Sequence, residues 1–377
     1  MRVAIIGCGY VAGLYYKTIP LYPEIEVLGA MDINPDRSTQ FASYYGIHRY
    51  ENIDEVVNDE RVEIIINLTN PESHYQISKM ALDAGKHVYC EKPLSMSYDD
   101  AKELVDLAES KNLLIVSAPS RILGETAQTM WKALREELIG KVRLVYAEMD
   151  DGLVHKMAYK TWKSDAGAPW PYKNEFELGC TLEHAGYTLT WLASFFGPAE
   201  SITAFASCQI PEKAPEVNRE KTGPDLTVAN IKFVSGVVAR VTCSLIAPAD
   251  HSIRIFGDEG ILRIDDCWKP RIPVRYKKRI NILGRSKTLP WWRSYPLLKD
   301  PRPKLNDRKF KKVDFCLGIT EMIEAINENR QCRLSGGFCL HITEMVLAIH
   351  NANNTNVPYM MKSTFQPMEP MPWAVKR

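Results

Sequence analysis

The stretch that decides the fold is RVAIIGCGYVA, residues 2–12 of a chain of 377 residues. Its first five residues form a β-rich apolar run, of the length expected for a strand buried on both faces. Two glycines and an alanine follow with the spacing G-x-G-x-x-A, and the pattern then becomes helical through about residue 22. This is the dinucleotide-binding fingerprint, in which a tight turn brings a pyrophosphate to a helix N-terminus. The predicted cofactor-binding residues of this turn are Gly7, Gly9, Tyr10, Val11 and Ala12.

An acidic residue stands where the second strand is expected to end. The apolar run 25–31 leads to Asp32, twenty positions after Ala12. A carboxylate there can accept both hydroxyls of a ribose and repel a 2′-phosphate, which favours NAD over NADP. Arg37 is a solvated helix charge or a partner for such a phosphate. The predicted cofactor is therefore NAD, with NADP less favoured.

Strand and helix patterns alternate as far as residue 120. Further strands are expected over 63–68, 86–90 and 113–117, and helices over 37–45, 53–58, 74–84 and 98–110. Such alternation predicts a doubly wound parallel sheet, an α/β Rossmann domain over residues 1–120.

The regular alternation of strand and helix patterns ends after residue 120. Longer strand patterns cover 199–208, 226–233, 237–244, 251–257 and 260–265, and helical patterns cover 124–138, 179–196, 315–329 and 337–352. This is typical of an α+β domain with a mostly antiparallel open sheet. We expect residues 121–377 to form a domain for substrate binding and oligomerisation.

Positive charge is concentrated in one segment. Lys and Arg exceed Asp and Glu by 47 − 46 = +1 overall, but residues 269–312 hold sixteen Lys/Arg against two Asp, or +14, which leaves −13 elsewhere. A balanced chain is not a general polyanion binder, so no nucleic-acid partner is predicted. The cations of the segment stand among Trp291 and Trp292, a mixture that could hold a nucleotide diphosphate. An acidic partner, nucleic acid, an anionic membrane surface and plain solvation are the alternatives.

Cysteine usage and hydropathy bear on location. Nine cysteines are scattered without a CxxC pair, so no metal site is predicted and free thiols in a reducing compartment are expected. We see no export signal and no apolar run of about 18 residues, so a cytoplasmic protein without a membrane span is expected.

Several short motifs occur together in a fixed order. After the fingerprint come Asp32-x-Asn34-Pro35, then Asn70-Pro71 with His74, then Glu91-Lys92-Pro93 behind a strand, Trp162, and Gly257-Asp258-Glu259-Gly260. In this order they resemble the Gfo/Idh/MocA family of NAD(P)-dependent oxidoreductases over most of the chain, and least over 269–312. The resemblance implies that Asn70, Pro71, His74, Glu91, Lys92 and Trp162 belong to the cofactor site.

The lysine of the Glu-Lys-Pro tripeptide lies, in that family, beside the nicotinamide and the reacting hydroxyl or carbonyl, which implies the same for Lys92. An ammonium there would stabilise oxygen charge during hydride transfer or shuttle a proton. A surface lysine at a turn is the alternative.

The family's second site motif, Gly-Gly-x-x-x-Asp-x-Gly-x-His, is altered here. Anchoring on Gly186 places His184 at the aspartate position and Thr188 at the histidine position, one helical turn apart on a shared face. We expect His184 to be the proton-transfer partner of Lys92, Thr188 to donate a hydrogen bond to substrate, and Tyr187 to be the reserve candidate. Glu183 is expected to point off this face. A hydrogen-bonded helix histidine is the alternative for His184.

Three residues complete the predicted substrate site. Lys163 follows Trp162 where the family has Trp-Arg, Arg121 follows the 113–117 strand, and Tyr159 lies in the intervening loop. The function predicted is hydride transfer between nicotinamide and a secondary alcohol or ketone of a sugar, with a nucleotide-linked sugar favoured. A regulator or assembly partner that binds NAD without chemistry is the alternative. The resemblance further implies a homodimer or homotetramer formed through the open sheet.

Overall fold

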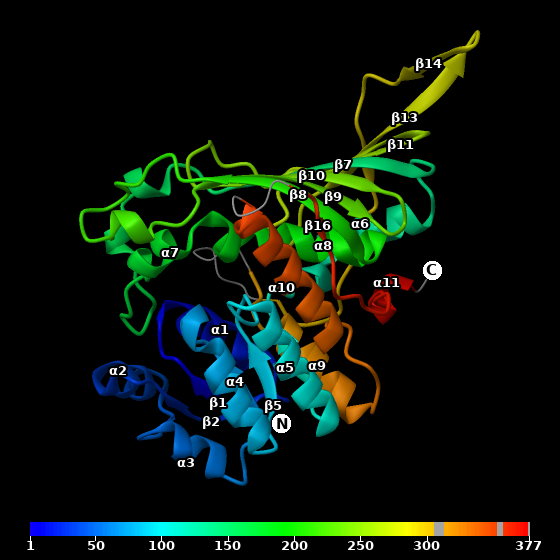
Figure 1. Ribbon diagram of the computed structural model, residues 1–377. Coiled ribbons are helices and arrows are strands. Elements are labelled where there is room, and N and C mark those ends of the chain that lie inside the picture. Colours follow the sequence, from blue (N-terminus) through cyan, green and yellow to red (C-terminus); the bar gives the residue numbers. More distant parts are fainter. Residues whose placement is uncertain (305–312, 353–356, 376–377) are drawn as a thin grey trace.

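The computed structural model describes residues 1–304, 313–352 and 357–375. Its N-terminal part is built on a sheet with the strand order β3-β2-β1-β4-β5-β6 (Figure 1), in which every neighbouring pair is parallel. The strands are β1 (Arg2–Ile6), β2 (Glu26–Met31), β3 (His48–Arg49), β4 (Ile64–Asn67), β5 (His87–Cys90) and β6 (Ile115–Ser117). The apolar side chains of β1 and β4 are buried throughout, as expected for strands covered on both faces. The predicted doubly wound parallel sheet is confirmed.

Helices connect these strands. They are α1 (Tyr10–Thr18), α2 (Pro35–Tyr45), α3 (Ile53–Asn58), α4 (His74–Asp83) and α5 (Tyr98–Ser110). Most begin at a polar cap: the Asn34 side chain accepts from the first turn of α2, and that of Ser97 from the first turn of α5. The strand order reverses between β1 and β4, and ligands of such sheets bind in the crevice beyond the strand ends at that point.

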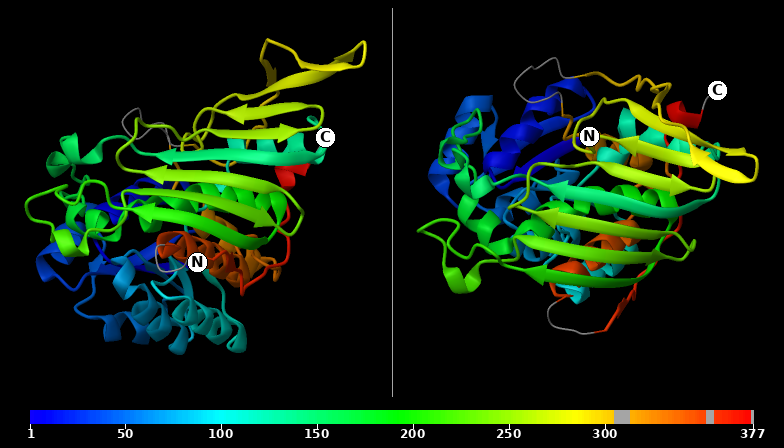
Figure 2. Two further views of the ribbon diagram at one scale, coloured as in Figure 1. Left: turned by 45° about the horizontal axis from the view of Figure 1, so that its top comes forward. Right: turned by 90° about the horizontal axis from the view of Figure 1, so that it is seen from above.

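A second sheet follows, with the order β14-β13-β12-β11-β7-β10-β9-β8-β16 and β15 paired with β13. Its strands are β7 (Val142–Asp150), β8 (Ala199–Ser207), β9 (Leu226–Phe233), β10 (Val238–Ser244), β11 (Ile253–Gly257), β12 (Gly260–Ile264), β13 (Val274–Ile282), β14 (Arg285–Thr288), β15 (Arg293–Tyr295) and β16 (Tyr359–Met360). Only β7 and β10 run parallel among these described strands, so the expected mostly antiparallel sheet is confirmed. Helices lie beneath one face, and Figure 2 shows the other face open.

The remaining helices are α6 (Glu125–Arg135), α7 (Tyr172–Leu178), α8 (Gly186–Phe196), α9 (Leu317–Asn327), α10 (Gly336–His350) and α11 (Pro372–Val375). Two of them return to the first sheet. Gly318 of α9 packs directly against the ring of Tyr89 in β5, so closely that a Cβ at this position would clash with the ring. The N–H of Ser117 in β6 donates to Sγ of Cys339 in α10 (3.2 Å). Since α10 also packs on β8, it joins both sheets and fixes the position of the residues between them. None of the described helices is long and apolar enough to cross a membrane.

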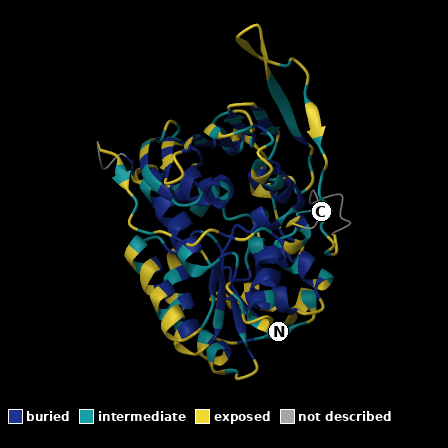
Figure 3. Cartoon of the chain, turned by 90° about the vertical axis from the view of Figure 1, so that its right-hand side faces the viewer, coloured by how far each residue is buried: buried dark blue, intermediate teal, exposed yellow. Residues whose placement is uncertain are grey.

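A ribbon of β13 and β14 extends from the edge of the second sheet, well clear of the body (Figure 1). Its two-residue turn has positive φ at Leu283 (51°) and Gly284 (75°), as tight hairpins require. The outer half of the ribbon is exposed on both faces (Figure 3), which explains why no hydrophobic alternation marks it in the sequence. Strands in the basic segment were therefore not predicted.

Candidate active site

The turn between β1 and α1 has the form that a pyrophosphate requires. A Cβ on Gly7, whose φ is +95°, would lie 2.5 Å from the carbonyl oxygen of Leu68, so only glycine fits there. Nothing lies within 4 Å of the corresponding point on Gly9, and no side chain caps α1, which begins at Tyr10. The first-turn N–H groups of α1 therefore face open space, and the turn fits the phosphates of a dinucleotide.

Asp32 lies directly beside this turn. It is largely buried, and its carboxylate accepts from the N–H of Cys8 (2.8 Å) and of Asn34 (2.9 Å). The guanidinium of Arg37 comes within 3.7 Å of the same carboxylate. The structure thus brings together the two side chains on which the choice between NAD and NADP was predicted to depend.

A hairpin over residues 162–170 lies against α1. Trp162 packs on Trp170 with ring centroids 5.0 Å apart, and Ser164 lies where a Cβ on Gly13 would stand. Lys163 in this hairpin is exposed. Trp162 is thus held near α1, and its contact with the cofactor stays a prediction.

Tyr159 is not placed as expected. Only 6% of it is exposed, and its ring packs against Trp170, Tyr172 and Phe176. The expected substrate contact of Tyr159 is not supported, because its ring belongs to the aromatic cluster under the hairpin.

The Glu91-Lys92-Pro93 turn is fastened on two sides. The Glu91 carboxylate accepts from the hydroxyl of Tyr15 in α1 (2.7 Å) and from the N–H of Lys92 (3.1 Å). His74 is fully buried, with one ring nitrogen 2.6 Å from the carbonyl oxygen of Pro93 and the other 3.0 Å from that of Thr69. Burial lowers the pKa of His74. Glu91 and His74 therefore hold Lys92 in place, and Asn70 and Pro71 begin the short helical turn that leads to His74.

Glu183, not His184, meets the ammonium of Lys92. The Lys92 Nζ to Glu183 Oε2 distance is 2.5 Å, and both side chains are largely buried. The expectation that Glu183 points off the face was wrong. A π-helical turn over Thr181–Ala185 precedes α8, and its wider winding changes which residues share a face with those of α8.

A second carboxyl, that of Glu175 in α7, adjoins this pair. Burial, followed by the charge of Glu183, raises the pKa of Glu175 to about 8, which favours a neutral carboxyl at pH 7. Burial alone would lower the pKa of Lys92, but the charges around it, that of Glu183 above all, outweigh burial and raise that pKa above its ordinary value. Lys92 is thus held as a charged ammonium with Glu183 as its counter-ion.

His184 faces a different carboxylate. Its Nδ1 lies 2.7 Å from Asp151 Oδ2, at the end of β7, and the other oxygen of Asp151 lies 2.9 Å from Nε2 of His251. Burial opposes a charged imidazole, but the charge of Asp151 raises the pKa of His184. Burial likewise opposes the charge on His251, and hydrogen bonds to Asp151 and Asp266 raise the pKa of His251 to about 9. Two histidines therefore share one buried carboxylate.

This sharing predicts a pH dependence of stability. The pKa of His251 is higher in the folded chain than the ordinary 6.5, so its contribution is complete below pH 6.5 and is lost as the pH rises through 9. We expect the free energy of unfolding to fall by on the order of 2 kcal/mol across this window, and His251→Gln to reduce that fall. Urea unfolding at pH 6, 7.5 and 9 measures it, with the exposed His48→Gln as control. If the free energy of unfolding changed equally with pH in His251→Gln and in the parent, the raised pKa of His251 would be contradicted.

Tyr187 and Thr188 are adjacent in α8 but have different surroundings. Tyr187 is half-buried between Arg121, whose guanidinium lies 5.3 Å from its ring centroid, and Trp268, whose ring centroid lies 5.2 Å away. Burial, followed by the charge of Glu91, raises the pKa of Tyr187 to about 12. Thr188 is fully buried, and its hydroxyl donates to Met149 Sδ (3.4 Å). The expected contact of Thr188 with substrate is not supported, since its side chain packs into the second sheet.

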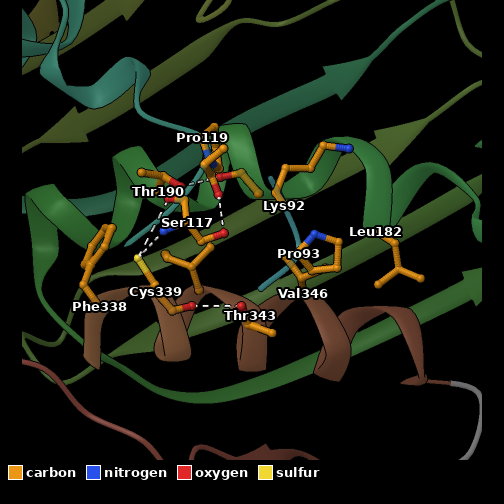
Figure 4. Close-up of a pocket in the computed structure, with 13 residues that line it drawn as sticks. Lys92, Pro93, Ser117, Pro119, Leu182, Thr190, Phe338, Cys339, Thr343 and Val346 are labelled. Carbon is orange, nitrogen blue, oxygen red and sulfur yellow. Dashed lines mark hydrogen bonds between the residues drawn. The ribbon is translucent and has the colours of Figure 1, made fainter. Parts of the chain in front are cut away.

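A cavity behind the Glu91-Lys92-Pro93 turn lies between α8 and α10 (Figure 4). Its hydroxyl groups are engaged with the backbone: Ser117 donates to Ala118, Thr190 to Gly186 and Thr343 to Cys339. The Lys92 side chain extends away from α10 (Figure 4), toward Glu183. The hydroxyl groups of this cavity are therefore not free to bind a sugar, and the ammonium of Lys92 lies on the side of Glu183.

Comparison with known proteins identifies the family. The model of an oxidoreductase family with an NAD-binding Rossmann fold matches residues 1–118, and that of the GFO/IDH/MocA C-terminal domain matches residues 127–263. The chain belongs to the Gfo/Idh/MocA family of oxidoreductases. It is similar to trans-1,2-dihydrobenzene-1,2-diol dehydrogenase of Bos taurus, with 26% identity over 278 residues, 72% of this chain and 76% of the relative.

Two solved structures of the same fold are informative. Levoglucosan dehydrogenase in complex with NADH and levoglucosan has a TM-score of 0.76 and 18% identity, over 96% of this chain and all of the other. The WlbA dehydrogenase of Bordetella pertussis, in complex with NADH and UDP-GlcNAcA, has a TM-score of 0.73 and 17% identity, over 96% and 98%. The Rossmann and antiparallel halves of this Gfo/Idh/MocA protein are thus arranged as in these dehydrogenases.

The structure adds five residues to the candidate site that the sequence did not place there: Asp151, Glu175, Glu183, His251 and Trp268. Asp151 directly follows β7, but no sequence signal separates it from its neighbour Asp150. Glu183 was missed because the anchoring on Gly186 assumed an unbroken helix. In the described residues, no group of three or more His, Cys, Asp or Glu could hold a metal ion.

Proposed function

We propose that this oxidoreductase transfers a hydride between NAD and a secondary alcohol or ketone of a sugar. The observation that carries the proposal is the buried Lys92–Glu183 pair on the turn after β5, with Tyr187 one helical turn beyond Glu183. It lies at the carboxyl edge of the parallel sheet, where the fingerprint turn also ends. The bound nicotinamide would accept or supply the hydride at its C4 position.

Lys92 and His184 would both act on the substrate oxygen, but in different roles. The Lys92 ammonium, kept charged by Glu183, stabilises negative charge as it develops on that oxygen. His184 transfers the proton, because Asp151 holds its Nδ1 and leaves Nε2 for the substrate. The imidazolium suits donation to a ketone oxygen, and the neutral ring suits removal of a hydroxyl proton. Tyr187 remains the reserve donor.

The proposed cofactor is NAD, with NADP less favoured, and the pair of Asp32 and Arg37 provides the test. Asp32→Ser removes the carboxylate that would repel a 2′-phosphate and leaves Arg37 free to pair with one. We expect the ratio of kcat/KM for NADP to that for NAD to rise by at least about tenfold. The substitution also removes the two hydrogen bonds from the backbone to Asp32. Any loss of activity from this cause affects both cofactors alike and cancels in the ratio. Asp36→Ser, on the exposed start of α2, is the matched control, and an unchanged ratio in Asp32→Ser would count against the assignment.

A nucleotide-linked sugar is the first substrate to test, because WlbA of the same fold was solved with UDP-GlcNAcA. The cations first suggested for the diphosphate do not support it. Arg285 is exposed on the outer part of the ribbon, Lys278 donates to the carbonyl of Leu138, and Lys277 lies over the ring of Trp292. A nucleotide would therefore depend on groups near Lys92.

The decisive experiment incubates the purified chain with NAD and a panel of free, phosphorylated, UDP-, GDP- and dTDP-linked sugars. Growth of the reduced-nicotinamide absorbance, with an oxidised product in the mass spectrum, is expected. NAD binding with no product from any sugar in either direction would instead favour the regulator that binds NAD without chemistry.

Assembly and location are proposed on separate grounds. The open face of the second sheet, which carries exposed Phe205 and half-buried Tyr146 and Phe256, suits a homodimer or homotetramer. All nine cysteines are free, as suits a reducing cytoplasm.

A further inference from the structure

Arg121 is a charged side chain without a counter-ion. It stands on the turn that follows β6, and its guanidinium is surrounded by the rings of Tyr187, Trp268 and Phe315, with centroids 5.3, 5.6 and 5.8 Å away. It donates one hydrogen bond, to the carbonyl of Trp268. Among the described residues, no carboxylate lies within ion-pair distance of it.

The acidic groups nearest to Arg121 are engaged elsewhere. Glu91 accepts from Tyr15, as described above. Asp266 pairs with Lys269 (3.1 Å) and accepts from the N–H of Trp268 (2.8 Å). Asp314, which lines the same cavity as Arg121, accepts from the hydroxyl of Tyr22 and from the N–H of Cys316. None of these carboxylates is free to neutralise the guanidinium.

Other enclosed arginines of the chain are treated differently. Arg302 pairs with Asp300 (2.7 Å), and Arg333 pairs with Glu321 (2.8 Å). Removing a charge from water without a partner is costly, which is why enclosed charges are normally paired. Burial lowers the pKa of Arg121, because removal from water disfavours the charged form of the guanidinium. An unpaired guanidinium beside a candidate active site therefore indicates a partner that arrives with the ligand.

Its position also fits substrate and not a remote ligand. The guanidinium of Arg121 lies 5.3 Å from the ring centroid of Tyr187, and Tyr187 lies one helical turn beyond Glu183, the partner of Lys92. Arg121 further lines two adjoining cavities, one with Glu91 and Tyr187 and the other with Trp268 and Lys269. Its remaining N–H groups have no acceptor among the described residues and are not sealed from solvent.

We propose that Arg121 binds an anionic group of the substrate, a carboxylate or a phosphate, while the reacting carbon lies at Lys92. The planar guanidinium matches either group through two parallel hydrogen bonds, and the surrounding rings keep it in plane and exclude water. This inference rests on the proposed function, and it narrows the substrate to a sugar acid, a sugar phosphate or a sugar nucleotide.

The test compares probes that differ in the anionic group. Binding of D-glucose, D-glucuronate, glucose 6-phosphate and UDP-glucuronate to the NAD-loaded chain is measured by calorimetry. We expect at least one anionic probe to bind about 10 to 100 times more tightly than glucose, Arg121→Met to abolish this preference and Arg121→Lys to retain part of it. Glucuronate against glucose 6-phosphate distinguishes a carboxylate from a phosphate. Arg135→Met is the matched control, because Arg135 also lies over an aromatic ring, that of Trp131.

The outcomes separate the two proposals. Equal binding of all probes, or a preference that survives in Arg121→Met, overturns the role of Arg121, and turnover of neutral sugars would still support the proposed function. A preference that depends on Arg121, without turnover of any sugar, leaves the anion site standing and refutes the dehydrogenase. Retained NAD affinity and an unchanged unfolding midpoint show that each variant is folded.

Discussion

Lys92→Ala is expected to lower kcat by at least about 10³-fold and to leave the affinity for NAD within about threefold. The reason is local. Nζ of Lys92 is directed toward Glu183 and away from α10 (Figure 4), and Lys92 is not part of the β1–α1 turn that is proposed to hold the phosphates. Its removal therefore deprives the reacting oxygen of its counter-charge without disturbing the cofactor cradle. Turnover is measured with the sugar identified in the panel, and NAD affinity by calorimetry.

A lysine elsewhere provides the control for this experiment. Lys102 lies on the exposed side of α5 and pairs with Asp106, so Lys102→Ala removes the same side chain without touching the site. It is expected to leave both quantities unchanged. Normal turnover in Lys92→Ala would refute the assignment of the active site.

Glu183→Gln is expected to affect stability and catalysis together. The amide cannot neutralise the ammonium, so Lys92 would be left as an unpaired charge in an enclosed position, at a cost of about 3 to 5 kcal/mol in the free energy of unfolding. The pKa of Lys92 would fall, because the charge of Glu183 is the largest effect that raises it. Activity that depends on the charged amine would then be lost at lower pH than in the parent.

Two measurements follow for Glu183→Gln: urea unfolding, and the pH profile of kcat. The exposed Glu109→Gln on α5 is the matched control, for which neither should change. An unchanged pH profile would show that Glu183 does not set the charge of Lys92.

The N-terminal half was predictable because its signals are local. The apolar run of residues 2–6, the two glycines and Asp32 lie within one βαβ unit, and the structure places them together as the fingerprint predicts. Lys92 was found through a short motif of the same kind. These patterns depend on neighbours in sequence, which a single chain displays directly.

The second half of the site depends on contacts across the fold. The partner of His184 is Asp151, which also binds His251. Asp151 and His251 are one hundred residues apart in the chain. The position of Glu183 depends on a π-helical turn that no periodicity in residues 179–196 reveals, so the helix was read with the wrong face toward Lys92. Trp268, which packs on both His184 and Tyr187, immediately precedes residues 269–312, the segment that resembles the family least.

The ribbon of β13 and β14 gives the molecule an electrical polarity. Residues 274–288, which include both strands, carry six Lys or Arg and no Asp or Glu, and the outer part of the ribbon stands outside the body (Figure 1). A molecule so divided has a large dipole moment despite its near-zero net charge. At low ionic strength, the molecule would approach a negatively charged surface with the ribbon foremost. Added salt would weaken this orientation, because it shortens the Debye length.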